Sequence, residues 1–386
     1  MNILFLAREN PFPADTGVKM RAWMVLKSLA KAHRVTLVCF GDDKNGSVPG
    51  CEAVHVIEPP AKKSGHPYGK MLLGLFSSLP FAVEGRISGD YDRKVKGLLD
   101  GNKFDLIVCD SLYLAPYVPA GATKTLLDEH NIESVIIRRY AQLERNIFKK
   151  VYALYELGRM KRFESQIWNR FDLMMVCSQV DKQQAEQRSR ANKIHVVPNG
   201  VLLPAELNNR EEPGTLLYSG LIGWRPNEDA VFYFAKEIYP LIKRAIPQTR
   251  WLIVGKGPTP AVKSLEEEGS ITVTGAVEKI EPYIEKSAVV VVPLRIASGT
   301  RLKILEALAM GKAVVSTSVG AEGLDVTYGK NILIADEPED FANAVIGLLK
   351  DVHKRKELGA NGRKLVEEKY SYEIIGKKID EVIKLI

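Results

Sequence analysis

Apolar and polar positions follow the same rhythm in both halves of the 386-residue chain. Short runs rich in Val, Ile and Leu alternate with longer segments whose apolar residues recur at helical spacing. Strands buried on both faces of a parallel sheet read as continuous apolar runs, and the segments between them read as covering helices. The pattern therefore predicts an α/β chain with two doubly wound parallel-sheet domains.

Strands and helices are predicted to alternate through each half. Strands of the first half are expected at Asn2–Ala7, Val35–Phe40, Ala53–Ile57, Leu106–Asp110, Lys124–Asp128, Leu173–Cys177 and Ile194–Val197, with helices at Gly17–Ala32, Asp92–Asp100, Ser134–Asn169 and Gln179–Arg188. Strands of the second half are expected at Thr215–Ser219, Trp251–Val254, Ile271–Thr274, Ala288–Pro293, Ala313–Thr317 and Ile332–Ile334. Helices between them are expected at Asn227–Ala245, Ala261–Glu267, Lys279–Lys286, Leu302–Met310 and Pro338–Leu349.

A polar stretch, Leu202–Gly214, separates the two cycles and is typical of a domain boundary. It predicts a first domain over residues 1–203 and a second over residues 204–370. The closing segment 371–386 predicts an amphipathic helix, because one stripe carries Ile375, Ile379, Val382, Ile383 and Ile386.

Composition supports an ordinary globular protein, with 46% hydrophobic and 26% charged residues. No apolar run approaches the length of a membrane span, and Met1–Asn10 lacks the basic start of a signal peptide, so a cytoplasmic location is expected. The four cysteines form no CxxC pair, which favours reduced thiols over a disulfide or a zinc site.

The net charge of +7 is concentrated in Arg138–Arg170, where nine basic residues face three acidic ones. Together with interleaved apolar residues, this stretch could dock on an anionic membrane. The alternative is a long solvated helix with an ordinary core face. The apolar stretch Met71–Val83 also favours a position at the inner face of the cytoplasmic membrane. No nucleic-acid recognition module is present, so nucleic acid is not an expected partner.

The segment "SGTRLKILEALAMG" predicts a helix that opens at Ser298 or Thr300, directly after an apolar strand. Arg301 and Lys303 then lie in its first turn, where cations are disfavoured unless an anion binds there. A phosphate seated on the helix start explains them. The alternative is that both side chains extend into water and Lys303 pairs with Glu306.

Three neighbouring features favour the phosphate. Glu306 lies at the border of the buried stripe, where sugar hydroxyls could supply hydrogen-bond donors. Gly255 and Gly257 form a tight turn after a strand, and Arg225 follows another strand. Since ligands bind beyond the carboxyl ends of parallel strands, these loops are expected to meet at one edge.

Several longer motifs occur in a characteristic order. They are "NPFPADTGVKMRAWMVLKSLAKAHRVTLV" with Gly17, "LDEHNIES" with His130, "IHVVPNGV", "IVGKGP", "TGAVEKIEPYIEKSAVVVVPL" and "GTRLKILEALAMGKAVVST". Over almost its whole length the chain resembles the retaining glycosyltransferases of family four. The resemblance implies the GT-B fold, with two facing Rossmann-like domains and a C-terminal helix that crosses back to the first.

The resemblance also implies a hexosyltransferase that moves a sugar from a nucleotide-sugar donor to a glycan or lipid-linked acceptor, with retention and without a metal or other cofactor. It assigns catalytic roles to His130, Arg225 and Lys303. The expected donor-binding residues are Gly17, Gly255, Gly257, Val277, Ser298, Thr300, Arg301, Leu302 and Glu306.

Two positions depart from the family pattern. Ser298 stands where the first signature glutamate is expected, and Leu221 stands where many members carry an arginine. With these departures, the residues expected to bind the diphosphate are Arg225, Arg301 and Lys303. The departures also keep open a sugar-nucleotide-binding subunit without catalysis, while a nucleotide-sugar epimerase is a further alternative.

Two local features have simpler interpretations. Asp90 and Asp92 spell a DxD triplet, but they precede a helix, where aspartates serve as caps, so no metal site is expected there. His130 could also satisfy only local backbone, although its position after a strand favours a functional role.

Overall fold

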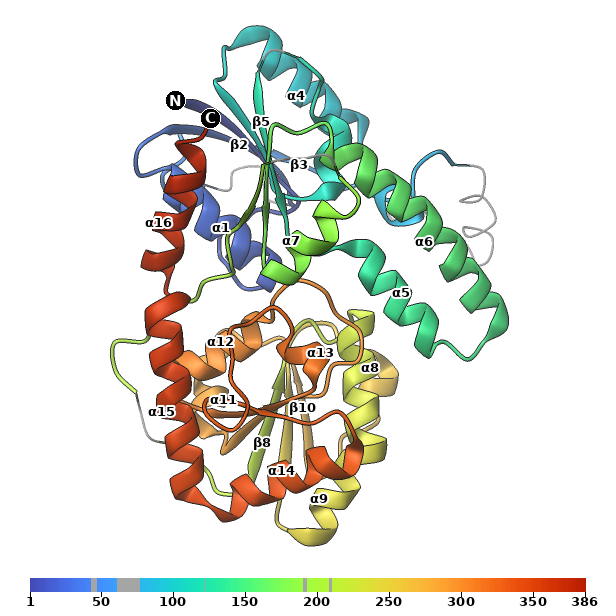
Figure 1. Cartoon of the computed structure of the whole chain (residues 1–386), viewed down its shortest axis with the longest axis vertical. Helices are drawn as coiled ribbons and strands as arrows, with labels where there is room; N and C mark the ends of the chain where they lie inside the picture. Colours follow the sequence, from blue (N-terminus) through green and yellow to red (C-terminus); the bar gives the residue numbers. More distant parts are fainter. Residues whose placement is uncertain (43–46, 61–76, 122, 190–192, 208–209) are drawn as a thin grey trace. The chain divides into compact units, whose positions relative to one another are not determined.

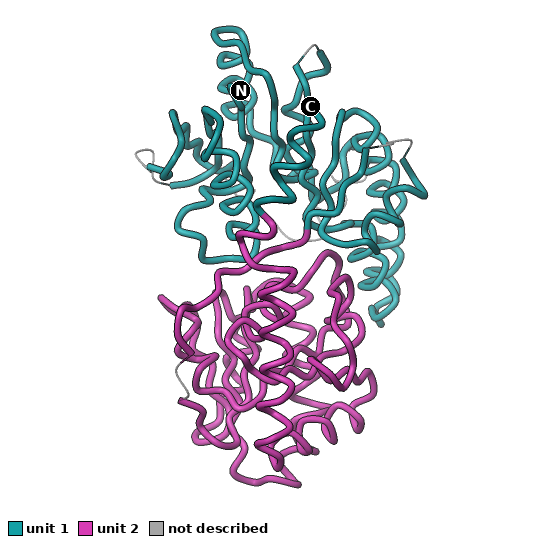
Figure 2. The backbone as a smooth tube through the Cα atoms, turned by 60° about the vertical axis from the view of Figure 1, so that its left-hand side comes forward, with its two compact units in different colours: residues 1–197, 376–386 teal, residues 198–375 magenta. Residues whose placement is uncertain are grey.

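The computed structural model describes residues 1–42, 47–60, 77–121, 123–189, 193–207 and 210–386. The chain divides into two compact units (Figure 2). Unit 1 contains Met1–Val197 and Gly376–Ile386, and unit 2 contains Pro198–Ile375. No helix in the described ranges is long and apolar enough to cross a bilayer. Part of the apolar stretch Met71–Val83 lies outside these ranges.

Unit 1 is built on a parallel sheet of seven strands in the order β3-β2-β1-β4-β5-β6-β7. Its strands are β1 (Asn2–Ala7), β2 (Arg34–Phe40), β3 (Ala53–Ile57), β4 (Leu106–Cys109), β5 (Lys124–Glu129), β6 (Leu173–Val176) and β7 (Ile194–Val196). Its helices are α1 (Gly17–Leu29), α3 (Phe81–Glu84), α4 (Gly89–Gly101), the 3-10 helix η1 (Leu112–Tyr117), α5 (Glu133–Leu143), α6 (Ile147–Trp168) and α7 (Gln179–Glu186).

Unit 2 is built on a parallel sheet of six strands in the order β10-β9-β8-β11-β12-β13, with helices on both faces (Figure 1). Its strands are β8 (Thr215–Ser219), β9 (Arg250–Val254), β10 (Ile271–Gly275), β11 (Val289–Val292), β12 (Ala313–Ser316) and β13 (Leu333–Ile334). Its helices are α8 (Arg225–Tyr233), the π-helical turn η2 (Phe234–Ile238), α9 (Tyr239–Ala245), α10 (Pro260–Lys263), α11 (Glu281–Lys286), α12 (Leu302–Ala309), α13 (Ser318–Ala321), α14 (Pro338–Lys350) and α15 (Val352–Lys369). A last helix, α16 (Tyr372–Ile383), begins in unit 2 and ends in unit 1.

Each predicted strand is present, because apolar runs such as Val289–Val292 are buried on both faces of their sheet. The single helix predicted over Ser134–Asn169 is wrong. The chain leaves the helical conformation at Glu144, and the side chain of Asn146 caps α6 by accepting from the backbone N–H groups of Phe148 and Lys149. Helix α15 is absent from the predicted elements.

Candidate functional site

In unit 2, the loops that follow β8 and β9 lie against each other. The N–H of Ile222 donates to the carbonyl of Lys256 at 2.9 Å. Gly220 and Gly255, the residues directly after the two strands, both have φ of 145°. A Cβ atom on Gly255 would lie 1.7 Å from the carbonyl oxygen of Gly220. Only glycine permits this approach, so the two strand ends present bare backbone at the edge of the sheet.

Lys303 reaches this edge from α12. A Cβ atom on Gly220 would lie 3.0 Å from its Nζ atom. Nζ donates to Oδ1 of Asn227 at 3.0 Å and lies 4.0 Å from the ring centroid of Tyr218. Within the described ranges the ammonium makes no ion pair with a carboxylate. The result is a cation held beside bare backbone by an amide and an aromatic face.

The helix that carries Lys303 begins where the predicted element Leu302–Met310 places it. α12 starts at Leu302, and Arg301 is its N-cap residue with extended backbone (φ −93°, ψ 100°). The other predicted opening, at Ser298 or Thr300, is wrong because Gly299 has φ of 72° and the backbone of Arg301 is extended. Arg301 is buried and donates to the carbonyl of Gly299. It therefore precedes the first turn, and Lys303 alone of the two cations lies within it.

The segment before α12 is held by "PNG", the first residues of unit 2. The side-chain amide of Asn199 donates to Oγ1 of Thr300 at 2.9 Å. Ser298 and Thr300 are both buried. The segment thus approaches α12 in a fixed conformation.

Glu306 lies one turn beyond Lys303 and is half-buried. Burial and then Glu281 raise the pKa of Glu306 to about 7, and Lys303 opposes this shift. No side chain in the described ranges donates a hydrogen bond to its carboxyl group. The carboxyl group of Glu306 can therefore accept hydrogen bonds from the hydroxyl groups of a ligand.

The other predicted residues of unit 2 lie at the starts of helices and in the loops after strands. Leu302 and Val277 are partly buried against the core of the unit, and Gly257 has φ of 66° in the loop after β9. Arg225 is exposed as the first residue of α8, two residues before Asn227. It therefore lies close in the chain to the amide that holds Lys303.

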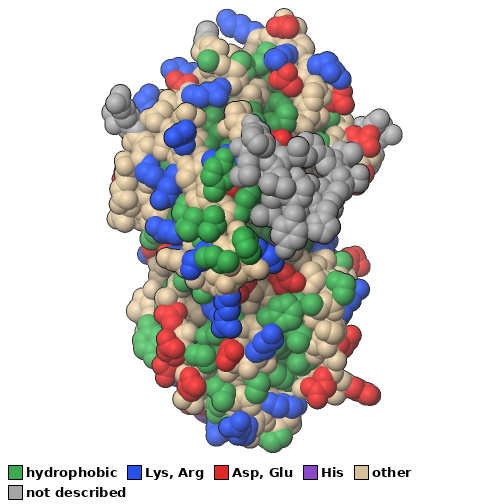
Figure 3. Space-filling model, turned by 90° about the vertical axis from the view of Figure 1, so that its right-hand side faces the viewer, with side chains coloured by type: hydrophobic (Ala, Val, Ile, Leu, Met, Phe, Trp, Pro, Cys, Tyr) green, Lys and Arg blue, Asp and Glu red, His purple; other side chains and the backbone are tan. Residues whose placement is uncertain are grey.

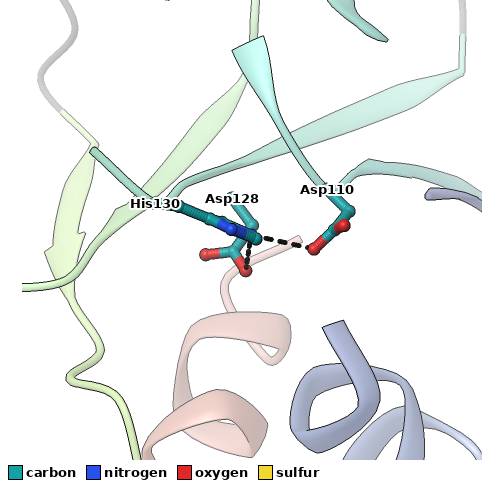
Figure 4. Close-up of side chains that lie close together, drawn as sticks. All are labelled: Asp110, Asp128 and His130. Carbon is teal, nitrogen blue, oxygen red and sulfur yellow. Dashed lines mark hydrogen bonds and ion pairs between the residues drawn. The ribbon is translucent and has the colours of Figure 1, made fainter. Parts of the chain in front are cut away.

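In unit 1, His130 follows β5 and meets two buried carboxyl groups (Figure 4). Its Nε2 atom lies 2.9 Å from Oδ1 of Asp110 and 3.5 Å from Oδ2 of Asp128. Arg21 of α1 donates to both oxygens of Asp128, at 2.6–3.2 Å. Burial disfavours the imidazolium, but Asp110 and then Asp128 outweigh it and raise the pKa of His130 to about 9. Gly17 is exposed as the first residue of α1.

Asp110, Asp128 and His130 each offer one possible metal ligand, and these atoms lie within 4.8 Å of one another. However, Arg21 occupies both oxygens of Asp128, and Nε2 of His130 is directed at the carboxyl groups as a donor. With His130 protonated, two cations balance two carboxylates. The residues therefore fit a bound proton better than a metal ion.

The DxD triplet lies on α4 and pairs with its own helix. Asp92 accepts from Lys96 at 2.6 Å, and Asp90 pairs with Arg93. The cap of α4 is Ser88, whose hydroxyl accepts from the N–H of Tyr91, so the predicted capping role of the aspartates is wrong. Both aspartates interact favourably with the helix N-terminus instead.

Sequence reasoning missed Asp110 as the partner of His130 and Asn227 as the partner of Lys303. Asp110 and His130 follow β4 and β5, which are neighbours in the sheet. Knowledge of the strand order would have brought them together, because the carboxyl ends of adjacent parallel strands lie side by side.

Comparison with known proteins gives two family matches. The model "Glycosyl transferases group 1" matches residues 213–351, and the model "Glycosyl transferase 4-like domain" matches residues 16–200. The chain belongs to the group 1 glycosyltransferases.

Individual proteins resemble the chain over nearly its whole length. The glycosyltransferase is 23% identical over 401 residues to an uncharacterized 44.6 kDa protein in the cps region of Klebsiella pneumoniae, covering 95% of this chain and 96% of the relative. Sucrose-phosphate synthase from Thermosynechococcus elongatus superposes with a TM-score of 0.72 at 20% identity, over 100% of this chain and 98% of that chain. Anabaena HepE in complex with UDP-glucose superposes with a TM-score of 0.70 at 16% identity, over 100% of both chains. The GT-B fold is confirmed.

Proposed function

We propose that this glycosyltransferase takes a nucleotide sugar as donor and binds its diphosphate at the start of α12. The observation that carries the proposal is the ammonium group of Lys303, which lies beside the bare backbone of Gly220 without a carboxylate partner in the described ranges. A diphosphate there would gain a cation and the N–H groups of the first helical turn. The UDP-glucose bound by Anabaena HepE supports this class of donor.

Transfer builds negative charge on the departing diphosphate, and preorganised cations can stabilise that charge without a metal. We assign this role to Lys303 and Arg225. Arg301 would fix the conformation of the segment that precedes α12. Glu306 would bind donor hydroxyls, and the loops after β9 and β10, with Gly255, Gly257 and Val277, would bracket the base. For His130 and Gly17 of unit 1, the catalytic and donor-binding roles are those that the family resemblance implies. Retention, by attack beside the leaving phosphate, is the stereochemistry that the family resemblance implies.

The test combines donor binding with turnover. Lys303→Ala should lower turnover on the order of a hundredfold or more while the protein stays folded, because a preorganised charge contact is lost. Glu306→Ala should chiefly weaken donor affinity, and Lys263→Ala, an exposed lysine on α10, is the matched control. A panel of nucleotide sugars screened by thermal stabilisation identifies the donor first.

Slow hydrolysis of the donor separates the alternatives. A transferase hydrolyses its donor without an acceptor, whereas a binding subunit leaves the donor intact. Wild-type activity in Lys303→Ala would remove the phosphate assignment, and an intact donor with the wild-type protein would support the binding subunit that Ser298 suggests.

For the acceptor we propose a lipid-linked glycan or a growing surface polysaccharide. The Klebsiella pneumoniae relative in the cps region supports this class. A surface of α6 supports it independently. Ile147, Phe148, Val151, Leu154 and Tyr155 lie on one face of this helix and are exposed, Phe148 at 79% and Val151 at 58%.

Basic side chains accompany this apolar surface. Arg145 and Lys149 are exposed beside it, and Lys150 is half-buried. Hydrophobic, Lys and Arg side chains also gather on the face of the molecule shown in Figure 3. Apolar insertion combined with cationic attraction is the chemistry of peripheral binding to anionic lipid. We therefore narrow the predicted membrane contact of residues 138–170 to the first turns of α6.

A further inference from the structure

Two arginines of unit 1 share one aromatic ring. The guanidinium carbon of Arg86 lies 4.1 Å from the ring centroid of Tyr113, and that of Arg8 lies 5.1 Å from it. Arg8 follows β1, and Tyr113 belongs to η1, which follows β4. Since β1 and β4 are adjacent parallel strands, this group lies at the carboxyl edge of the sheet, where α/β domains bind ligands.

Arg86 is held in place by local hydrogen bonds. Its guanidinium donates to the carbonyl of Ala82, and its own carbonyl accepts from the hydroxyl of Tyr117 at 2.9 Å. Arg8 is half-buried and makes no side-chain hydrogen bond to any described residue. One guanidinium is therefore preorganised, and the donors of the other are available to a ligand.

Neither arginine makes an ion pair within the described ranges. Glu133, close to the hydroxyl of Tyr113, attracts both arginines electrostatically. The exposed Glu9 attracts Arg86, and the buried Asp110 attracts Arg8. Burial and then the charge of Arg8 lower the pKa of Arg86. Two neighbouring guanidiniums that repel each other, without a carboxylate at bonding distance, favour an anion between them.

We propose that Arg8 and Arg86 bind a phosphate group of the acceptor. This inference rests on the proposed function, because it supplies the acceptor side of the same transfer. A single carboxylate has two oxygens and satisfies one arginine fork, whereas a phosphate offers enough oxygens for two. The phosphate could belong to a lipid-linked acceptor or to a water-soluble sugar phosphate.

The test measures phosphate binding by calorimetry in the Lys303→Ala background, which weakens the diphosphate position proposed in unit 2. The probes are dodecyl phosphate in uncharged detergent micelles and glucose 6-phosphate. Arg8→Gln/Arg86→Gln should lower the affinity for a bound probe on the order of tenfold or more, because charge-assisted hydrogen bonds are lost. Arg93→Gln, an exposed arginine on α4, is the matched control and should change nothing.

We expect dodecyl phosphate to bind, which indicates a lipid-linked acceptor. Binding of glucose 6-phosphate alone supports the same site with a soluble acceptor. Equal affinity in the control and the double variant, or no binding of either probe, overturns the proposal. If the double variant melts early, Arg8→Gln alone serves, since Arg8 makes no side-chain hydrogen bond to the described residues.

Donor binding to otherwise wild-type protein carrying Arg8→Gln/Arg86→Gln separates this proposal from the proposed function. Unchanged donor affinity with lost probe binding supports a site distinct from the donor position. Absence of donor binding in the wild type would remove the proposed function and leave the phosphate measurements unaffected.

Discussion

Lys303 and Glu306 lie one turn apart on α12, and both titrate near neutrality. Burial and then Arg301 lower the pKa of Lys303 to about 7, while burial raises that of Glu306 to about 7. A bound diphosphate favours the charged form of Lys303, so donor binding must raise the pKa of this lysine. Donor binding is therefore linked to proton uptake wherever the free lysine is neutral.

The first prediction concerns this uptake. Above pH 7 free Lys303 is increasingly deprotonated, so donor affinity should fall as pH rises from about 8 to about 9, with uptake of up to about one proton on binding. Glu306 is already largely ionised in this pH range and therefore contributes little to the proton uptake. Calorimetry in two buffers of different ionisation enthalpy measures the uptake. Lys303→Met should abolish it, and equal uptake in that variant would show that another group titrates.

The same residues show where sequence reasoning stops. Strand ends collect at one edge of a parallel sheet, so the positions of Lys303 and His130, together with the family resemblance, made them candidate site residues. Their partners could not. In the sequence, Asp110 is recognisable only as the end of a predicted strand, and Arg21 only as one position of a predicted helix. The order of β1, β4 and β5 in the sheet is what brings Asp110 to His130 and Arg21 to Asp128.

At the scale of elements, strands were predictable because burial on both faces demands unbroken apolar runs. Helices were less so. Half of the residues in the segment of α15 are charged, and the segment contains Gly359 and Gly362, which are typical of helix breaks. In the structure these glycines allow α15 to approach α12 closely. A Cβ atom on Gly359 would lie 1.9 Å from the carbonyl oxygen of Gly311.

The second prediction follows from that contact. Gly359→Ala should lower the free energy of unfolding of unit 2 by about 1–3 kcal/mol, because the added methyl group forces the helices apart. Gly347→Ala on α14 is the matched control, since no atom lies within 4 Å of its Cβ position. That variant should be neutral or more stable by about 0.5–1 kcal/mol. Denaturant titration compares them, and equal effects would refute a packing role for Gly359.

The third prediction concerns the exposed face of α6. Phe148→Ser/Val151→Ser should weaken binding to vesicles of phosphatidylglycerol and phosphatidylcholine on the order of tenfold or more, because both apolar side chains lose their burial in the membrane. Co-sedimentation measures the bound fraction. Tyr328→Ser, which alters a side chain 68% exposed in unit 2, should bind as the wild type does.

Two results would contradict this prediction. Vesicle binding that is unchanged in the α6 variant would assign this face to another partner. Binding that also persists in high salt and on uncharged vesicles would exclude a role for the accompanying basic residues.

At the scale of the whole molecule, the described parts of the two units have separate hydrophobic cores, and the chain returns from unit 2 to unit 1 at its C-terminal helix. The core of unit 2 lies within residues 201–370 and a core of unit 1 within residues 4–194. Gly376–Ile386 nevertheless belongs to unit 1, where the hydroxyl of Ser28 on α1 donates to Asp380 at 3.3 Å. The residues at the far end of the sequence therefore complete the unit in which the chain begins.

The fourth prediction tests this return. Ile379 is fully buried on α16, so Ile379→Ala should destabilise unit 1 by about 2–5 kcal/mol through the lost methyl groups and the remaining cavity. Because the cores are separate, hydrogen exchange should increase for amides of β1 and α1 and stay unchanged for β8 and β11. Leu385→Ala, which alters a side chain 57% exposed, is the control. Faster exchange spread equally over both units would mean that they unfold as one cooperative body rather than two.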